Sequence, residues 1–200
     1  MKTRKIIEDL EKLKEELNVV DMDQTPNAGH KFLDIETHQV TLANGKTFNR
    51  EKLTKNNRDG SAVVIVPVTL ENETFVIVQP RVFTKNGIGV EIPAGYIDPG
   101  ETPMMAAKRE LREEIGCESQ ELIPLKSYYQ DQGISAAYNT CFLALGCIEK
   151  YPQKLDCDEY IKYMKCSLDD LYYLLDTGII NDANGIIAIE EARKTLKRKN

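Results

Sequence analysis

Three glutamates at helical spacing are the residues of this chain best placed to do chemistry. Glu110, Glu113 and Glu114 stand at positions i, i+3 and i+4, so they share one face of a helix predicted over residues 104–115. Like charges on one face repel, and a hard divalent cation such as Mg²⁺, which prefers oxygen ligands, would relieve that repulsion. The alternative is a solvated helix face balanced by its neighbouring cations, namely Lys108, Arg109 and Arg112.

The segment before this helix points to phosphate chemistry. A solvated face does not explain why Pro93-Ala94-Gly95 and then Glu101 lead into the helix. Bound Mg²⁺ keeps several waters, and phosphate oxygens usually complete its coordination shell. Clustered carboxylates of this kind suggest a site for pyrophosphate substrates, where metal ions bridge the phosphates and lower the pKa of an attacking water.

Residues 95–117 resemble the signature of the Nudix hydrolase family. That signature is Gly-x5-Glu-x7-Arg-Glu-U-x-Glu-Glu-x-Gly-U, in which U is a bulky apolar residue. Leu111 occupies the first U position, and Cys117 is smaller than usual at the last. Every fixed position is matched, by Gly95, Glu101, Arg109, Glu110, Glu113, Glu114 and Gly116.

The resemblance implies a metal site. Glu110, Glu113 and Glu114 correspond to metal ligands, and the backbone carbonyl of Ala94 corresponds to a further ligand. The expected cofactor is Mg²⁺, with Mn²⁺ as the other candidate. The implied reaction is hydrolysis of a nucleoside diphosphate linked to another group.

The other fixed positions have supporting roles in this resemblance. Arg109 would orient a glutamate by a charge-assisted hydrogen bond, and Glu101 would support the geometry of loop and helix. Gly95 allows a loop conformation that a side chain would obstruct.

Outside the signature, the chain is similar to ADP-ribose pyrophosphatases over about residues 38–192. The matching segments are residues 40–45, 62–68, 91–101 and 178–188. Strands mixed with helices, without regular βαβ alternation, indicate an α+β fold or a mixed-sheet sandwich. The resemblance implies that this fold is a Nudix-type α/β/α sandwich with a mixed sheet. It also implies that ADP-ribose is cleaved to AMP and ribose 5-phosphate. The alternatives are another sugar-nucleotide diphosphatase, for example one for GDP-mannose, or a sensor that binds ADP-ribose without cleaving it.

Two residues outside the signature are candidates for substrate binding. Arg81 is a candidate phosphate ligand, because a guanidinium matches phosphate oxygens, and Glu91 is a candidate contact on the substrate side. An aromatic residue should stack on the base, and the candidates are Phe32, Phe48 and Phe83.

The chain departs from the ADP-ribose pyrophosphatase pattern at three places. Residues 129–135 contain no proline, and Pro80 replaces the usual tyrosine beside Arg81. In the acidic loop over residues 156–159, Cys157 stands where the family carries a glutamate. We expect either that a neighbouring acid, Glu159, binds metal or acts as a base, or that the loop is shifted relative to the family.

Composition narrows the class of partner. The net charge is −6 and the pI is about 5.1, which argues against a nucleic acid or an anionic membrane surface as partner. No apolar segment is long enough for a signal peptide or a membrane span, so we expect a cytoplasmic protein. The five cysteines lack a disulfide or zinc pattern and are interpreted as free thiols.

The remaining elements support two regions. Residues 1–59 form an N-terminal region, with an amphipathic helix whose apolar face covers its own core or a partner chain. A β-hairpin follows within residues 31–53, turning at Asn44-Gly45. Residues 60–200 form the hydrolase domain. Because this branch of the family commonly exchanges N-terminal strands between subunits, we expect a homodimer.

Overall fold

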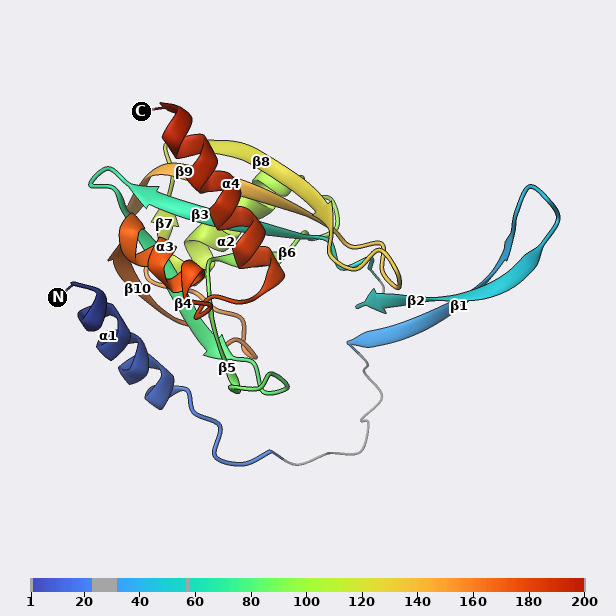
Figure 1. The fold of residues 1–200 in the computed structure, drawn as a ribbon, viewed down its shortest axis with the longest axis horizontal. Coiled ribbons are helices and arrows are strands. Elements are labelled where there is room, and N and C mark those ends of the chain that lie inside the picture. The colour runs from blue at the N-terminus through green and yellow to red at the C-terminus, as the bar shows by residue number, and fades with distance from the viewer. Residues whose placement is uncertain (1, 23–31, 57, 200) are drawn as a thin grey trace.

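The computed structural model describes residues 2–22, 32–56 and 58–199, which form four helices and ten strands (Figure 1). Residue 31, where the predicted hairpin region begins, lies outside the described residues. The helices are α1 (Lys2–Glu16), α2 (Pro103–Ile115), α3 (Leu168–Asp176) and α4 (Ala183–Lys199). The strands are β1 (Leu33–Thr41), β2 (Thr47–Lys55), β3 (Ala62–Thr69), β4 (Glu73–Pro80), β5 (Ile88–Glu91), β6 (Ala94–Tyr96), β7 (Cys117–Glu118), β8 (Glu121–Tyr129), β9 (Tyr138–Glu149) and β10 (Lys162–Ser167).

The main sheet is mixed, as the sequence predicted. Its strand order is β10-β4-β3-β9-β7, with β5 paired to β4, β6 to β3 and β8 to β9. The central pair β3 and β9 is parallel, and the other pairs are antiparallel. The predicted α+β class is therefore confirmed.

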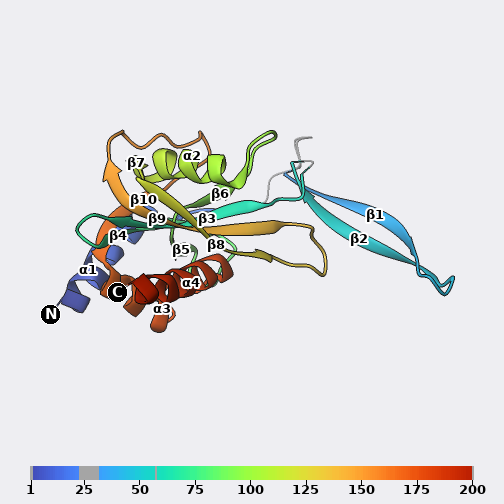
Figure 2. The same cartoon turned by 90° about the horizontal axis from the view of Figure 1, so that it is seen from above.

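Helices cover both faces of this sheet (Figure 2). Alternate side chains of β3 point to opposite faces, so Val63 and Ile65 join one apolar cluster and Val64 and Val66 join the other. The first cluster includes Leu111 and Ile115 of α2. The second is covered by α1, α3 and α4 (Figure 2). The result is an α/β/α sandwich.

Helix α1 belongs to the core of its own chain. Ile6 and Leu10 are buried at 4% and 1% exposure and lie in the same cluster as residues of α3 and α4. The helix contacts α3, β4 and β10. The sequence left open whether the apolar face of this helix covers its own core or a partner chain. In the structure it covers its own core.

The hairpin β1–β2 forms a separate two-stranded sheet that projects from the sandwich (Figures 1 and 2). Asn44-Gly45 lies in its turn, as predicted, but the connection runs over residues 42–46, and of these two residues Gly45 alone has a positive φ, of 80°. Ile35 is 60% exposed, and Leu33 is 49% exposed. The amide of Leu53 donates to the carbonyl of Ile134 at 2.7 Å, which ties the base of the hairpin to the sandwich.

Strand β10 was missed in the sequence. Its sequence, Lys-Tyr-Met-Lys-Cys-Ser, shows no clear alternation of apolar and polar residues. The strand lies at the edge of the sheet, where one side is unpaired and polar residues are common. Its register on β4 pairs Tyr163 with Ile77.

None of the described helices is long and apolar enough to cross a membrane. All five cysteines are free, and Cys157 is the exposed one.

The packing of α1 can be tested by truncating Leu10. Leu10→Ala should lower the free energy of unfolding by about 2–5 kcal/mol, because it leaves a cavity between α1 and the sandwich. The control Val20→Ala, at a side chain that is 95% exposed, should change it by less than about 0.5 kcal/mol. Chemical denaturation measures both. Equal, small effects would mean that α1 is not packed on its own subunit in solution.

Candidate active site

Helix α2 is capped at both ends by the residues that the sequence predicted. The Thr102 hydroxyl accepts a hydrogen bond from the amide of Met105 at 3.3 Å, and Pro103 occupies the first turn. Gly116 ends the helix in the left-handed region, at a φ of 65°. The ends of the helix that carries the three glutamates are thus fixed by local sequence.

Gly95 is a glycine because a carboxylate packs directly on it. A Cβ at this position would lie 1.9 Å from Oε1 of Glu110 and 2.1 Å from its Cδ. The backbone of Gly95 is not in the left-handed region. The reason is therefore the close approach of Glu110 rather than an unusual loop conformation.

Glu110 and Glu114 are largely removed from water. Their residues are 6% and 2% exposed. Burial raises the pKa of Glu110 to about 7, although Arg109 opposes the shift. Burial and the charge of Glu110 raise the pKa of Glu114 well above its ordinary value, and one hydrogen bond from the amide of Ala94, at 3.0 Å, opposes this.

Arg109 organises the signature. Its Nε and Nη2 donate to the two carboxylate oxygens of Glu101, both at 3.0 Å. Nη2 also donates to the carbonyl of Tyr96 at 2.8 Å. Nη1 donates to Glu110 at 2.6 Å and to Glu113 at 3.0 Å. One guanidinium therefore ties the loop before α2 to two of the three glutamates on the helix.

Glu101 fixes the loop end of this network. Its carboxylate also accepts a hydrogen bond from the amide of Asp98 at 3.0 Å. The Arg109 guanidinium holds the pKa of Glu101 below its usual range. Glu101 is thus placed to support the geometry of loop and helix, the position that the sequence suggested.

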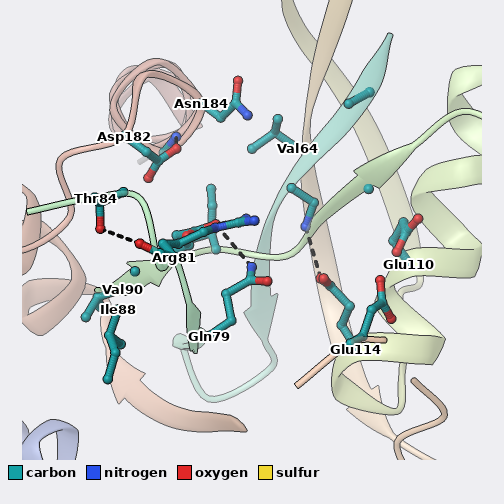
Figure 3. A pocket seen from close by; sticks show the side chains of 18 of the residues that line it. Val64, Gln79, Arg81, Thr84, Ile88, Val90, Glu110, Glu114, Asp182 and Asn184 are labelled. Carbon is teal, nitrogen blue, oxygen red and sulfur yellow. Dashed lines mark hydrogen bonds and ion pairs between the residues drawn. The ribbon is translucent and has the colours of Figure 1, made fainter. Parts of the chain in front are cut away.

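The donor chemistry suits a hard divalent cation. Glu110 and Glu114 lie side by side on α2 (Figure 3), next to Gly95 and Ala94 of β6, and one guanidinium and one amide compensate part of their negative charge. Among the described residues, no three acidic, histidine or cysteine side chains are gathered as a metal site. Glu110 and Glu113 both accept hydrogen bonds from Arg109. A cation with oxygen preference would compensate the charge that burial leaves on this pair.

A cavity of about 1280 Å³ opens beside these carboxylates. Its lining runs from Glu110, Glu113 and Glu114 on α2 to Asp182 at the start of α4, and includes Lys14 near the end of α1. Figure 3 shows Arg81, Asp182 and Asn184 on the side of the cavity away from Glu110 and Glu114. A cavity of this size can hold a ligand of the size of a sugar nucleotide.

Arg81 and Glu91, predicted as separate candidates, form a pair in the cavity wall. Arg81 donates from Nε and Nη2 to the two oxygens of Glu91, both at 2.7 Å, and Gln79 donates to Glu91 at 3.2 Å. The pair raises the pKa of Arg81, chiefly through the hydrogen bonds to Glu91. Glu91 therefore holds the guanidinium at the cavity, where the N–H donors that Glu91 does not occupy can meet an anion.

Sequence reasoning did not single out Asp182 and Asn184 as cavity residues. Asp182 caps α4 by accepting from the amide of Gly185 at 2.7 Å, and burial raises its pKa. Asn184 accepts from Tyr128 at 2.5 Å and from Asn139 at 3.0 Å. In the sequence, Asp182 stands at the cap position before the last helix. That position alone does not show that the start of this helix faces the cavity.

The match to known proteins is consistent with this geometry. The NUDIX domain family matches residues 58–187. The chain belongs to this family and is a Nudix hydrolase. It is 33% identical over 162 residues to the ADP-ribose pyrophosphatase of Bacillus subtilis (strain 168), covering 80% of this chain and 84% of that one.

Two further proteins are similar to this chain over most of its length. The chain is 30% identical to the methanol dehydrogenase activator of Bacillus methanolicus, over 84% of this chain and 90% of that one. A crystal structure of an ADP compounds hydrolase superposes with a TM-score of 0.70, at 24% identity, over 92% of this chain and 95% of that chain. That likeness confirms the predicted Nudix-type sandwich.

The acidic loop of this Nudix hydrolase faces the carboxylates of α2. Glu159 and Asp156 line the same cavity as Glu110 and Glu114. The Glu159 carboxylate accepts from the amide of Asp156 at 3.1 Å. Cys157, which stands at the usual glutamate position, is exposed and is not among the lining residues.

None of the three predicted aromatic platforms lines the cavity. Phe83 is 93% exposed, and the Phe48 ring lies under the guanidinium of Arg50 at 4.7 Å. Phe32 packs on Tyr96 with ring centroids 6.0 Å apart. Tyr96 is the aromatic side chain that does line the cavity. Tyr96 directly follows Gly95 of the family signature, and this position could have indicated that its ring lies at the cavity.

The burial of Glu110 predicts a dependence of stability on pH. Because its folded pKa is about 7 against an ordinary 4.5, the native state retains a proton that the unfolded chain releases. Stability should therefore fall as pH rises from about 4.5 to 7. In metal-free buffer at pH 8, Glu110→Gln should be more stable than the wild type by about 1–3 kcal/mol, and the two should converge near pH 4.

Thermal unfolding with and without Mg²⁺ completes this test. Added Mg²⁺ should stabilise the wild type at pH 8 and have a much smaller effect on Glu110→Gln, because binding to the native state raises stability. Equal stability of the two proteins at pH 8, together with no response to Mg²⁺, would contradict a desolvated carboxylate that binds a cation.

Proposed function

We propose that this Nudix hydrolase cleaves the pyrophosphate bond of a nucleoside diphosphate sugar, with ADP-ribose as the preferred substrate and AMP and ribose 5-phosphate as products. The observation that carries the proposal is that the carboxylates of α2 and the guanidinium of Arg81 face one cavity. The names of relatives support the substrate class, since these include ADP-ribose pyrophosphatases and an ADP compounds hydrolase.

The metal site of this proposal lies at Glu110, Glu113, Glu114 and the backbone carbonyl of Ala94. Mg²⁺ is the expected ion, with Mn²⁺ as the alternative. When bound, the ion would supply charge stabilisation on the phosphates and lower the pKa of a bound water. Release of Glu113 from Arg109 would add its carboxylate to the two buried ones.

The protein's own side chains then have distinct tasks. Arg109 and Glu101 keep the loop before α2 against the helix, so that Gly95 stays beside Glu110. Arg81, held by Glu91, would bind a phosphate oxygen with the guanidinium donors that Glu91 does not occupy. Glu159, which lines the cavity together with Glu110 and Glu114, would accept the proton of the attacking water.

The same proposal includes a homodimer in the cytoplasm. The projecting hairpin exposes Leu33 and Ile35, which a second subunit would cover. Free thiols, four of them buried, are those of a protein in a reducing compartment. Light scattering should give twice the chain mass of 22.7 kDa. A mass of one chain at micromolar concentration would contradict the dimer.

Substitution of Glu114 tests the proposed chemistry. Glu114→Gln keeps the shape of a buried side chain and its acceptor for the Ala94 amide but removes the charge. Turnover should fall by about 100-fold or more, because the variant loses a metal ligand. Glu71→Gln, in the exposed turn between β3 and β4, is the matched control and should keep wild-type turnover. Near-normal turnover of folded Glu114→Gln would remove Glu114 from the reaction.

A substrate panel tests the specificity. Purified protein with Mg²⁺ would be given ADP-ribose, GDP-mannose, UDP-glucose and NADH, and phosphatase would release phosphate from monophosphate products. ADP-ribose should be cleaved at the highest kcat/KM. Cleavage of GDP-mannose in preference would keep the reaction and move the specificity to another sugar nucleotide. Tight binding of ADP-ribose without turnover of any substrate would favour the sensor.

A further inference from the structure

The C-terminus of α2 is held by a segment far along the chain. The last carbonyls of a helix lack partners within the helix. Here the carbonyl of Gly116 accepts hydrogen bonds from the amides of Lys150 at 2.9 Å and Tyr151 at 3.1 Å, and the carbonyl of Glu113 accepts from Lys154 at 2.9 Å. Residues 150–154 therefore attach directly to the helix that carries the glutamates.

The side chain of Gln153 completes this attachment. Its Nε2 donates to the carbonyl of Glu114 at 2.7 Å and to the carbonyl of Ile161 at 3.1 Å. Both acceptors are carbonyls, which fixes the orientation of the amide and uses both of its protons. One side chain thus bridges the backbone of α2 and the far end of the acidic loop.

The bridge closes the loop at its base. Leu155, just after Gln153, and buried Ile161 pack on the apolar cluster beneath α2. Residues 156–160 between them are exposed, and the exposed stretch carries Glu159. Glu159 lines the cavity together with Glu110 and Glu114. The placement of Glu159 relative to α2 therefore depends on contacts at the two ends of this short loop.

We propose that Gln153 is a positioning residue that holds the loop bearing Glu159 over the carboxylates of α2. It acts through two carbonyls and touches no reacting atom. The inference rests on the proposed function, because it gives Glu159 a part in the reaction. The donor requirement is specific: a glutamate has the same shape but cannot donate to either carbonyl, and a methionine keeps the volume without any donor.

Hydrogen exchange tests the anchoring without any substrate. In Gln153→Met, the amides of residues 156–161 should exchange at least about 10-fold faster than in the wild type, because the loop opens more often. Gln153→Glu is the second variant and should behave alike, while the exposed control Gln120→Ala should not. Unchanged exchange of the loop in both Gln153 variants would overturn the proposal, whether or not the protein turns over any substrate.

A double-mutant cycle tests the positioning. Gln153→Met should lower kcat by about 10- to 100-fold with little change in KM, the cost of a misplaced catalytic group. In a Glu159→Gln background the same change should have almost no further effect, because the group being positioned is already absent. Losses that multiply in the double variant, or wild-type kcat in Glu159→Gln, would overturn it. An inactive wild type with normal loop anchoring would instead contradict the proposed function.

Discussion

Glu110 and Glu114 are carboxylates held almost out of water, and much of the surrounding structure keeps them there. Burial of a charged carboxylate is unfavourable by several kcal/mol unless hydrogen bonds or a cation compensate it. The protein supplies partial compensation through Arg109 and the amide of Ala94. Gly95 lets the Glu110 carboxylate lie against the backbone. The remaining negative charge is what makes this position suited to a divalent cation.

The sandwich fixes the segments that surround Glu110 and Glu114. Parallel strands β3 and β9 form the centre of the sheet, and β6 pairs with β3 so that Gly95 lies opposite Val63 and beside Glu110 of α2. Helix α2 is fixed at its start by Thr102 and at its end by residues 150–154. The same cavity then reaches α4 and the Arg81–Glu91 pair on the far side. Phosphate chemistry and recognition of the rest of the substrate would thus be divided between the two ends of one cavity.

Local sequence determined much of what could be predicted. The cap at Thr102, the stop at Gly116 and the turn at Asn44-Gly45 act within a few residues, and the structure has all three. The mixed order of strands and helices predicted the α+β fold, and the family resemblance predicted the Nudix-type sandwich. The spacing of Glu110, Glu113 and Glu114 placed them on one helix face, and they do line one cavity.

What the sequence could not provide depends on contacts between distant segments. The pairing of Arg81 with Glu91 requires β4 and β5 to be neighbours, and the bridge of Gln153 requires the loop to return to α2. Neither residue type nor spacing encodes those contacts. Edge strand β10 escaped because its alternation is weak, and Tyr96 was overlooked because it stands inside a loop motif.

Pyrophosphate hydrolysis at these carboxylates is tested most directly by following ADP-ribose with ³¹P NMR in the presence of the purified chain. With Mg²⁺ present, the diphosphate resonances should be replaced by two monoester resonances, from AMP and ribose 5-phosphate, and a chelator should stop the conversion. Persistence of the diphosphate resonances with Mg²⁺ and Mn²⁺, at protein concentrations where ADP-ribose is bound, would contradict the claim that these buried carboxylates serve pyrophosphate hydrolysis.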